Sequence, residues 1–438
     1  MARRAVFLLS LLVAAPFVGA QPAEPTMQEL LEQNRRLEAQ VREQQRLIES
    51  LGGQVSDVLK ASARQEEAIR GLQERADAPP DAGAPERPLA QEIRLSAEAG
   101  LAFFRTGPAG QFPNSEFRVD DAKVFLEAPV WRRTYFFGEF DITTREAGDE
   151  AFHAGELYLD FEDVPTPWAP EHLLNLRLGR FYIPFGEEYQ VRNVMDNPLI
   201  SHSIADPWGV DEGIEAYGGV GGLHYVVAVQ NGGDKALHDG LPDKAVAARV
   251  GYDPARWLHL SASAMRTGDL SASGDGTSAL WFGGGFFRAL GAAATTQRFH
   301  ASLAELDATV RWKEGRLDTA FGGARFGDSD RTADDTRHLS YYQVGAMQQL
   351  GGGFFVAARY SRLRAPGGYP LVGQGDFGTY FFRSPLTEQL ERRSIGMGYR
   401  FGPPLVWKAE YNIESGRLST GAPRDREDLL ATEIGLRF

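Results

Sequence analysis

The feature that most constrains the fold is a period-two alternation of apolar and polar residues, which recurs from about residue 91 to the C-terminus. Between Ile93 and Phe103, apolar residues occupy every second position and Arg94, Ser96 and Glu98 lie between them. Successive side chains of a β-strand point to opposite faces, so such a segment predicts a strand with one apolar and one polar face. The same pattern returns in 136–142, 157–161, 258–264 and 304–313. The chain beyond residue 90 is therefore predicted to be all-β.

The connections between these segments alternate between short and long. The short ones lie near 130–132, 220–222, 253–256, 313–316, 349–353 and 402–404, and the long ones near 143–152, 187–212, 232–243, 268–297, 327–337, 365–388 and 415–428. Asp163 to Glu171 is longer than the other turns. Short turns at one end and long loops at the other are typical of a membrane barrel, whereas a soluble sandwich requires no such order. We predict a 16-stranded antiparallel transmembrane β-barrel over 91–438, because about sixteen strands fit between the connections and the number must be even.

Tryptophan placement supports a membrane barrel. Five tryptophans lie beside predicted short connections: Trp131, Trp168, Trp257, Trp312 and Trp407. Aromatic girdles mark the bilayer interfaces of such barrels, where an indole ring is half wet. Outer-membrane lipid is thus an expected partner.

Composition excludes several other functions. The chain has no cysteine, which rules out thiolate metal sites and cysteine nucleophiles. A net charge of −13 argues against a nucleic-acid partner, which would need basic patches. The sequence also has no phosphate-cradling glycine loop and no His-Glu-x-x-His pair, so we expect neither a cofactor nor a metal.

The N-terminal ninety residues read as three segments. Residues 1–20 combine two arginines, an apolar stretch and small residues before Gln21, which predicts a secretory signal peptide. Residues 21–76 carry a heptad pattern, which predicts an α-helical coiled coil of two or three strands in the periplasm. Residues 77–90 contain four prolines and predict a stiff linker.

The longest informative connection follows a strand that ends at Ile183-Pro184-Phe185-Gly186. Proline lacks the donor that a strand ladder needs, so the strand should stop there. The next residues are too apolar for a solvated loop, and a long loop within a compact domain is usually functional. Its charged residues are Glu187, Glu188, Arg192, Asp196, Asp206, Asp211 and Glu212, a net charge of −5. At the narrow point of a channel, this loop alone would favour cations.

Three stretches carry a resemblance to a known family: Leu178 to Glu188 around the Pro-Phe-Gly stop, Asp211 to Ile214, and Tyr225 to Gly232. Together they resemble the phosphate-selective porin O and P family, and the likeness extends more weakly from about residue 91 to the end. The resemblance implies a 16-stranded outer-membrane porin of a Gram-negative bacterium, a trimer whose third loop constricts a passive diffusion channel for phosphate or other small anions. The acidic loop departs from the basic constriction that this family would require.

The end of the chain fits the same resemblance. Ile434, Leu436 and Phe438 fall on one face of the last predicted strand. A terminal aromatic residue such as Phe438 resembles the signal by which the barrel-assembly machinery recognises its substrates.

Basic residues occupy polar positions of the predicted strands, which a barrel would turn toward its lumen. They are Arg94, Lys123, Arg177, Arg249, Arg311, Arg325, Arg359, Arg400 and Arg437. Acidic residues such as Glu139 and Glu305 alternate with them. They form either cross-strand charge pairs that stabilise the wall or a track for anions, because arginine offers phosphate a bidentate contact.

Two other functions stay open at this stage. The coiled coil predicts a structural tether between outer membrane and cell wall. Ser201, His202 and Asp206 supply the residue types of a barrel-embedded hydrolase, although no Gly-x-Ser-x-Gly motif accompanies them.

Overall fold

The structure, a computed structural model, describes residues 93–143, 153–164, 172–204, 206, 209–232, 243–271, 296–329, 335–369 and 386–438. The predicted signal peptide, coiled coil and linker all lie outside the described residues, as do Trp168 and most of the loop at 268–297. No helix among the described residues has the length and apolar character that crossing a bilayer requires.

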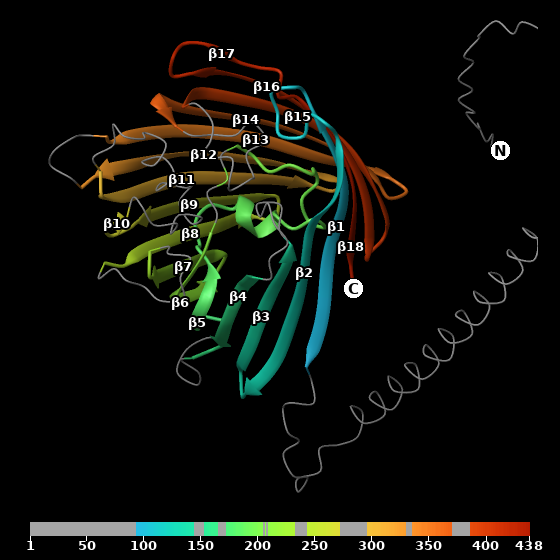
Figure 1. Ribbon diagram of the computed structural model, residues 1–438. Helices are drawn as coiled ribbons and strands as arrows, with labels where there is room; N and C mark the ends of the chain where they lie inside the picture. Colours follow the sequence, from blue (N-terminus) through green and yellow to red (C-terminus); the bar gives the residue numbers. More distant parts are fainter. Residues whose placement is uncertain are drawn as a thin grey trace, which may run out of the picture. The chain divides into compact units, whose positions relative to one another are not determined.

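Sixteen long antiparallel strands form one closed sheet (Figure 1). They are β1 (Arg94–Thr106), β2 (Glu116–Trp131), β3 (Thr134–Thr143), β4 (His153–Phe161), β5 (Asn175–Tyr182), β6 (Val210–Val220), β7 (Leu223–Gln230), β8 (Ala245–Ala255), β9 (Leu258–Arg266), β11 (Arg298–Trp312), β12 (Gly315–Asp328), β13 (Arg337–Gly351), β14 (Phe354–Tyr369), β15 (Thr387–Gly402), β16 (Leu405–Leu418) and β18 (Leu429–Arg437). Two short strands, β10 (Leu270–Ser271) and β17 (Pro423–Arg424), extend the long loops. Because β1 pairs with both β2 and β18, the sheet has no free edge, and the predicted 16-stranded barrel is confirmed.

The two ends of the barrel differ as the sequence predicts. All six short connections are two-residue turns: 132–133, 221–222, 256–257, 313–314, 352–353 and 403–404. The turn at Gly352 and Gly353 needs positive φ at both positions, 61° and 89°, which glycine adopts without steric cost. We call this the short-turn end, and the opposite end the long-loop end.

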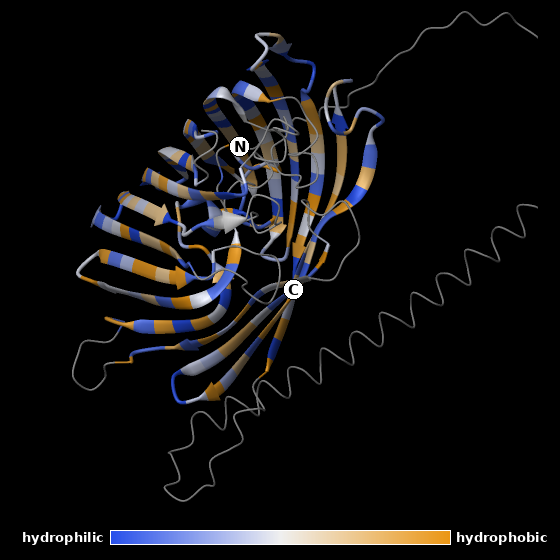
Figure 2. Ribbon diagram, turned by 60° about the vertical axis from the view of Figure 1, so that its left-hand side comes forward, coloured by the Kyte–Doolittle hydropathy of each residue, from blue (hydrophilic) through white to orange (hydrophobic). Residues whose placement is uncertain are grey.

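The alternation separates an apolar outer face from a polar inner face, and Figure 2 shows it as bands along the strands. On β11, Leu306 is 61% exposed on the outer face, whereas its neighbours Glu305 and Asp307 are buried on the inner face. Trp131, Trp257 and Trp312 lie at the short-turn end with exposed side chains. Trp407 lies there too, near the start of β16, so the predicted girdle is confirmed for the four described tryptophans.

Candidate functional site

The connection from β5 to β6, residues 183–209, folds into the interior of the barrel, and we call it the inner loop (Figure 1). After β5 the chain turns inward at Gly186, whose φ is +71° and whose amide donates to Ser263 Oγ on β9 at 3.0 Å. Ile183 and Phe185 are buried in the apolar cluster beside this turn. The loop then forms one short 3-10 helix, η2 (Glu188–Val191).

Lys408 on β16 holds the far side of the inner loop. Its ammonium is buried and donates to the carbonyl oxygens of Val194 at 2.8 Å and Leu199 at 3.0 Å. Glu433 on β18 lies 2.8 Å from the same Nζ and balances its charge. A buried ammonium requires such partners, so this cluster fixes the position of the loop backbone.

Glu410, two residues along the same face of β16, binds the next part of the loop. Its carboxylate accepts hydrogen bonds from the amides of Ile200 at 2.5 Å and Ser201 at 2.8 Å, and from Ser201 Oγ at 2.5 Å. Asn412 donates to the same hydroxyl at 3.3 Å. The loop amides therefore find charged acceptors on the wall, which are stronger than neutral ones.

Inward-facing glycines leave room for the apolar side chains of the loop. A Cβ on Gly435 of β18 would lie 2.5 Å from Val194 Cγ1, and one on Gly100 of β1 would lie 3.2 Å from Val194 Cγ2. On β15, a Cβ on Gly396 would lie 2.7 Å from Leu199 Cδ2. The contacts at Gly435 and Gly396 would force an atom to move and the one at Gly100 would be tight, so these glycines form seats for Val194 and Leu199.

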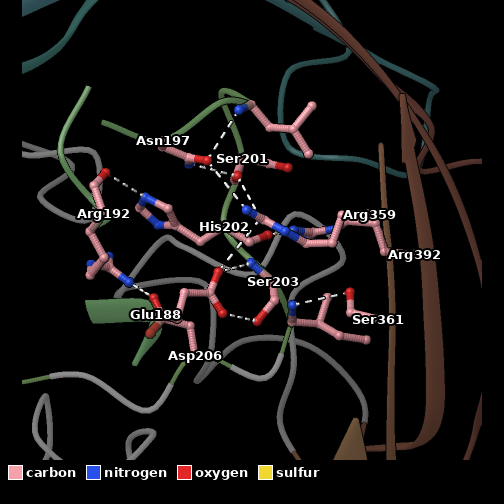
Figure 3. A network of polar contacts seen from close by, with 12 residues as sticks. Glu188, Arg192, Asn197, Ser201, His202, Ser203, Asp206, Arg359, Ser361 and Arg392 are labelled. Atoms are coloured by element: carbon pink, nitrogen blue, oxygen red, sulfur yellow. Dashed lines mark hydrogen bonds and ion pairs between the residues drawn. The ribbon is translucent and has the colours of Figure 1, made fainter. Parts of the chain in front are cut away.

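Two more strands complete the attachment (Figure 3). Arg392 on β15, which is fully buried, donates to the carbonyl of His202 at 2.8 Å and pairs with Glu414 at 2.5 Å. The amide of Ile204 donates to Ser361 Oγ on β14 at 3.4 Å. The inner loop is thus bound to β8 and β9 on one side and to β14, β15, β16 and β18 on the other.

The first loop carboxylate, Glu187, is paired with two basic residues of the wall. Arg249 Nε lies 3.5 Å and His259 Nε2 lies 3.3 Å from its Oε1. Arg249 also donates to the carbonyl of Gly186 at 2.7 Å and to the Tyr189 hydroxyl at 3.1 Å. Burial raises the pKa of Tyr189 above its usual value, so its hydroxyl stays neutral and accepts this bond.

Glu188 and Asp206 are also paired. Glu188 lies 3.5 Å from Arg359 Nη1 on β14 and accepts a bond from the Ser203 amide at 2.8 Å. Arg192 and Asp206, fourteen residues apart in the inner loop, form an ion pair with each other (Figure 3). The loop therefore closes on itself as well as on the wall.

Asp196 completes the set of charged loop residues. Its carboxylate lies 2.8 Å from Arg437 Nη2, and the same guanidinium pairs with Glu98 on β1 at 2.7 Å. Arg400 donates to the Met195 carbonyl at 3.0 Å. The wall arginines and the loop acids, which the sequence presents as separate features, are largely one interface.

Asp211 and Glu212 are not part of the loop, contrary to the prediction, because β6 begins at Val210. Asp211 is buried and accepts the Gly232 amide at 2.7 Å. Glu212, in the opposite phase of the strand, pairs on the outer face with Arg180 at 2.8 Å. In the sheet, Asp211 pairs with Phe181 and Glu212 pairs with Arg180, so neither acidic residue belongs to the loop.

The other predicted wall bases divide into inner and outer residues. Lys123 pairs with Glu139 at 3.0 Å and Arg177 with Asp160 at 3.0 Å, both on the inner face. Arg94 faces Glu127 across β1 and β2 on the same inner face. The prediction that Arg325 lines the lumen is wrong: Ala324 and Phe326 on either side of it are buried inward, so Arg325 points outward.

Below the inner loop, toward the short-turn end, lies a polar cavity of about 160 Å³. Its charged lining residues are Glu187, Glu188, Asp307, Arg311, Arg316, Asp318 and Arg359. Arg316 pairs with Asp318 at 3.0 Å, whereas the side chain of Arg311 has no ionic partner among the described residues. Both signs of charge therefore face this space.

Ser201 and His202 do not form a catalytic pair. Ser201 Oγ donates to Glu410, and His202 Nε2 lies 3.2 Å from the carbonyl of Arg192 (Figure 3). A hydrolase would need the imidazole against the nucleophilic hydroxyl. Among the residues that the structure describes, no three acidic or histidine side chains are grouped to hold a metal ion.

Sequence reasoning missed the residues that position the loop: Lys408, Glu410, Arg392 and the three seat glycines. The sequence did contain a signal for Lys408 and Glu410. Lys408, Glu410, Asn412 and Glu414 occupy successive inward positions of one strand. Buried charges at alternate positions need partners, and an element inside the barrel can supply those that the neighbouring strands do not.

Comparisons with known proteins support the fold class. No family model matches the sequence, and no curated protein matches it. Among solved structures, the chain is similar to the outer membrane channel DcaP of Acinetobacter baumannii, with 10% identity, a TM-score of 0.55 and coverage of 79% of this chain and 97% of that one. It is also similar to OprB of Pseudomonas putida, with 10% identity, a TM-score of 0.51 and coverage of 79% and 94%. OmpT, an outer membrane protein of Vibrio cholerae, gives 9% identity, a TM-score of 0.51 and coverage of 79% and 97%.

At these identities the likeness shows the fold alone. The chain has the barrel fold of these outer membrane proteins, which agrees at that level with the resemblance seen in the sequence. Membership of the phosphate-selective porin O and P family itself stays a prediction.

Proposed function

We propose that the protein is a passive diffusion channel of the outer membrane for small hydrophilic ions and solutes. The observation that carries this proposal is the inner loop, which is bound to opposite walls of the barrel above a charged cavity. A loop held across a barrel narrows the passage, and charged groups at a narrowing bias which ions pass. Neighbours with the same fold include an outer membrane channel. The function requires no cofactor and no catalytic residue.

On selectivity, we propose a modest preference for cations. The phosphate function implied by the resemblance would need free arginines along the lumen, but Arg249, Arg359 and Arg400 are all bound to the inner loop. Without Asp211 and Glu212, the inner loop has four acidic residues against Arg192, a formal charge of −3, and pairing offsets most of it. The wall of β2 to β6 adds negative charge. There Glu139 and Asp141 pair with Lys123, and Asp160 and Glu215 pair with Arg177, so four acids share two bases.

We further propose that the long-loop end faces the outside of the cell and that three copies assemble as a trimer. Short periplasmic turns and long external loops are usual for this barrel class. Phe438, which is 78% exposed at the end of β18, stays a prediction as the signal for the barrel-assembly machinery. The periplasmic position of the helical arm is part of the same proposal.

Reversal potentials test both the channel and its selectivity. Purified full-length protein is inserted into a planar bilayer under a potassium chloride gradient, and the measurement is repeated with added phosphate. We expect conductance, a reversal potential of the sign for cation preference, and no block by phosphate. Arg311→Gln should increase the cation preference, whereas the outward-facing Arg325→Gln should leave it unchanged.

Absence of conductance from correctly folded protein would contradict the channel. Anion preference that phosphate blocks would contradict the proposed selectivity and restore the function that the resemblance implies.

A further inference from the structure

A cluster of basic side chains lies on the outer face of the barrel near the long-loop end. It comprises Arg266, Arg298, Arg325, His338 and Arg364, on β9, β11, β12, β13 and β14. We call it the outer basic cluster. All five side chains are exposed, and none has an ionic or hydrogen-bonding partner within the described ranges.

Strand register brings its members together. Ser302 on β11 pairs with Arg266 on one side and with Arg325 on the other, and Arg325 in turn pairs with His338. Neighbouring strands lie about 4.8 Å apart, so the α-carbons of Arg266 and Arg325 are roughly 10 Å apart. Arg364, one strand beyond His338, pairs with Ser340. Arg266 on β9, Arg325 on β12, His338 on β13 and Arg364 on β14 thus lie at nearly the same height, with Ser302 of β11 between the first two and Arg298 of β11 nearer the rim.

That height corresponds to a membrane interface. Trp312 ends β11 in the girdle at the short-turn end, ten residues after Ser302. Ten residues extend about 34 Å along a strand, and a tilt of about 40° reduces this to roughly 26 Å along the membrane normal. The apolar band of such barrels is about 25 Å tall. The outer basic cluster therefore lies where the opposite layer of lipid headgroups begins.

The positive charge is local to this sector. On the neighbouring strands β7 and β8, the outward residues at the same height are Val229 and Val246, and Val246 pairs directly with Arg266. On β14 and β15, the outward Arg362 and Arg393 are both paired with Glu391, at 3.4 Å and 3.3 Å. The wall thus groups several unpaired arginines in this sector, whereas the unpaired Arg105 on β1 lies apart from them.

We propose that the outer basic cluster binds the phosphate groups of an anionic glycolipid in the outer leaflet of the membrane. A guanidinium group can bind two oxygens of one phosphate at the same time. Arginines without an acidic partner attract anionic lipid when they lie at a headgroup surface. The exposed Leu306 and Phe321, on the membrane side of the cluster, would contact the acyl chains. The inference rests on the proposed outer-membrane location and orientation, but not on ion conduction.

Binding of lipopolysaccharide to the full-length protein in nanodiscs of neutral lipid tests this proposal. Three probes are compared: lipopolysaccharide with its phosphates, the same glycolipid after enzymatic dephosphorylation, and inorganic phosphate alone. We expect tight binding of the first only. Arg266→Gln/Arg325→Gln/Arg364→Gln should weaken it roughly a hundredfold, because each surface arginine contributes about tenfold or less.

Matched variants separate charge from folding. Arg105→Gln removes an exposed, outward-facing arginine from β1, outside the cluster, and should leave binding unchanged. The triple arginine-to-lysine variant keeps the charge and should retain most of the binding. A wild-type shift in gel migration on boiling shows that each variant is a folded barrel.

Equal binding by the wild type and the folded glutamine variant would overturn the proposal, as would equal binding of dephosphorylated glycolipid. Competition by millimolar inorganic phosphate would indicate a general anion site instead. A protein that binds the glycolipid but carries no current would refute the channel and leave this inference standing.

Discussion

Glu410→Ala should release the inner loop from the wall. The substitution removes the acceptor for the amides of Ile200 and Ser201 and for the Ser201 hydroxyl. A buried N–H left without a partner costs about 1–3 kcal/mol, so two of them weaken docking of the loop by roughly 2–6 kcal/mol. Even the lower figure raises the ratio of undocked to docked loop about thirtyfold.

Single-channel recording measures this change directly. An undocked loop widens the passage, so we expect larger conductance steps and new transitions between open levels. Glu410→Gln keeps one oxygen and should give an intermediate result. The control is Glu391→Ala on the adjacent strand, because this glutamate faces outward and binds Arg362, Arg393 and Gln389 rather than the inner loop.

Traces of Glu410→Ala that match those of the wild type, from protein that still shows a folded barrel on a gel, would refute the reasoning. The loop would then be held without these bonds, and the contacts of Lys408 and Arg392 would carry the attachment.

Two further predictions concern the same loop. Gly435→Val should displace Val194 and raise the conductance, because a Cβ at position 435 would lie 2.5 Å from Val194 Cγ1. The control is Gly345→Ala, at an inward position where a Cβ would have its nearest neighbour 3.9 Å away, and it should leave the conductance unchanged. Unaltered conductance in Gly435→Val would show that Val194 is not seated as described. Arg249→Gln should shift the reversal potential toward cation preference, because it leaves the charge of Glu187 without its arginine partner. A unit charge about 8 Å from a passing ion in water changes the local concentration of that ion roughly twofold. A shift toward anion preference would contradict the assignment of the pair.

The barrel was predictable because its determinants are local. Alternation fixes the face of each residue, and the glycines at 352–353 indicate a turn in the sequence. The sequence-based predictions failed where the exact phase or pairing of a strand decides on which face a residue lies. Arg325 is one residue out of phase with the buried Ala324 and Phe326, and Glu212 belongs to β6 because that strand begins at Val210, within the predicted loop.

The attachment of the inner loop was not predictable in detail, because its partners are distant in sequence. Ser201 and Glu410 are 209 residues apart, and no local pattern indicates that they meet. The net charge of the loop was likewise a poor guide to its field, since Glu187 and Glu188 are each paired with a wall base.

The seat of Val194 has a consequence for the order of events in biogenesis. Its two glycines come from the first strand and the last, Gly100 and Gly435, which face each other across the pair that closes the cylinder. Before β18 pairs with β1, that seat does not exist. Ring closure must therefore precede the seating of Val194, so the loop cannot reach its final position in an open sheet.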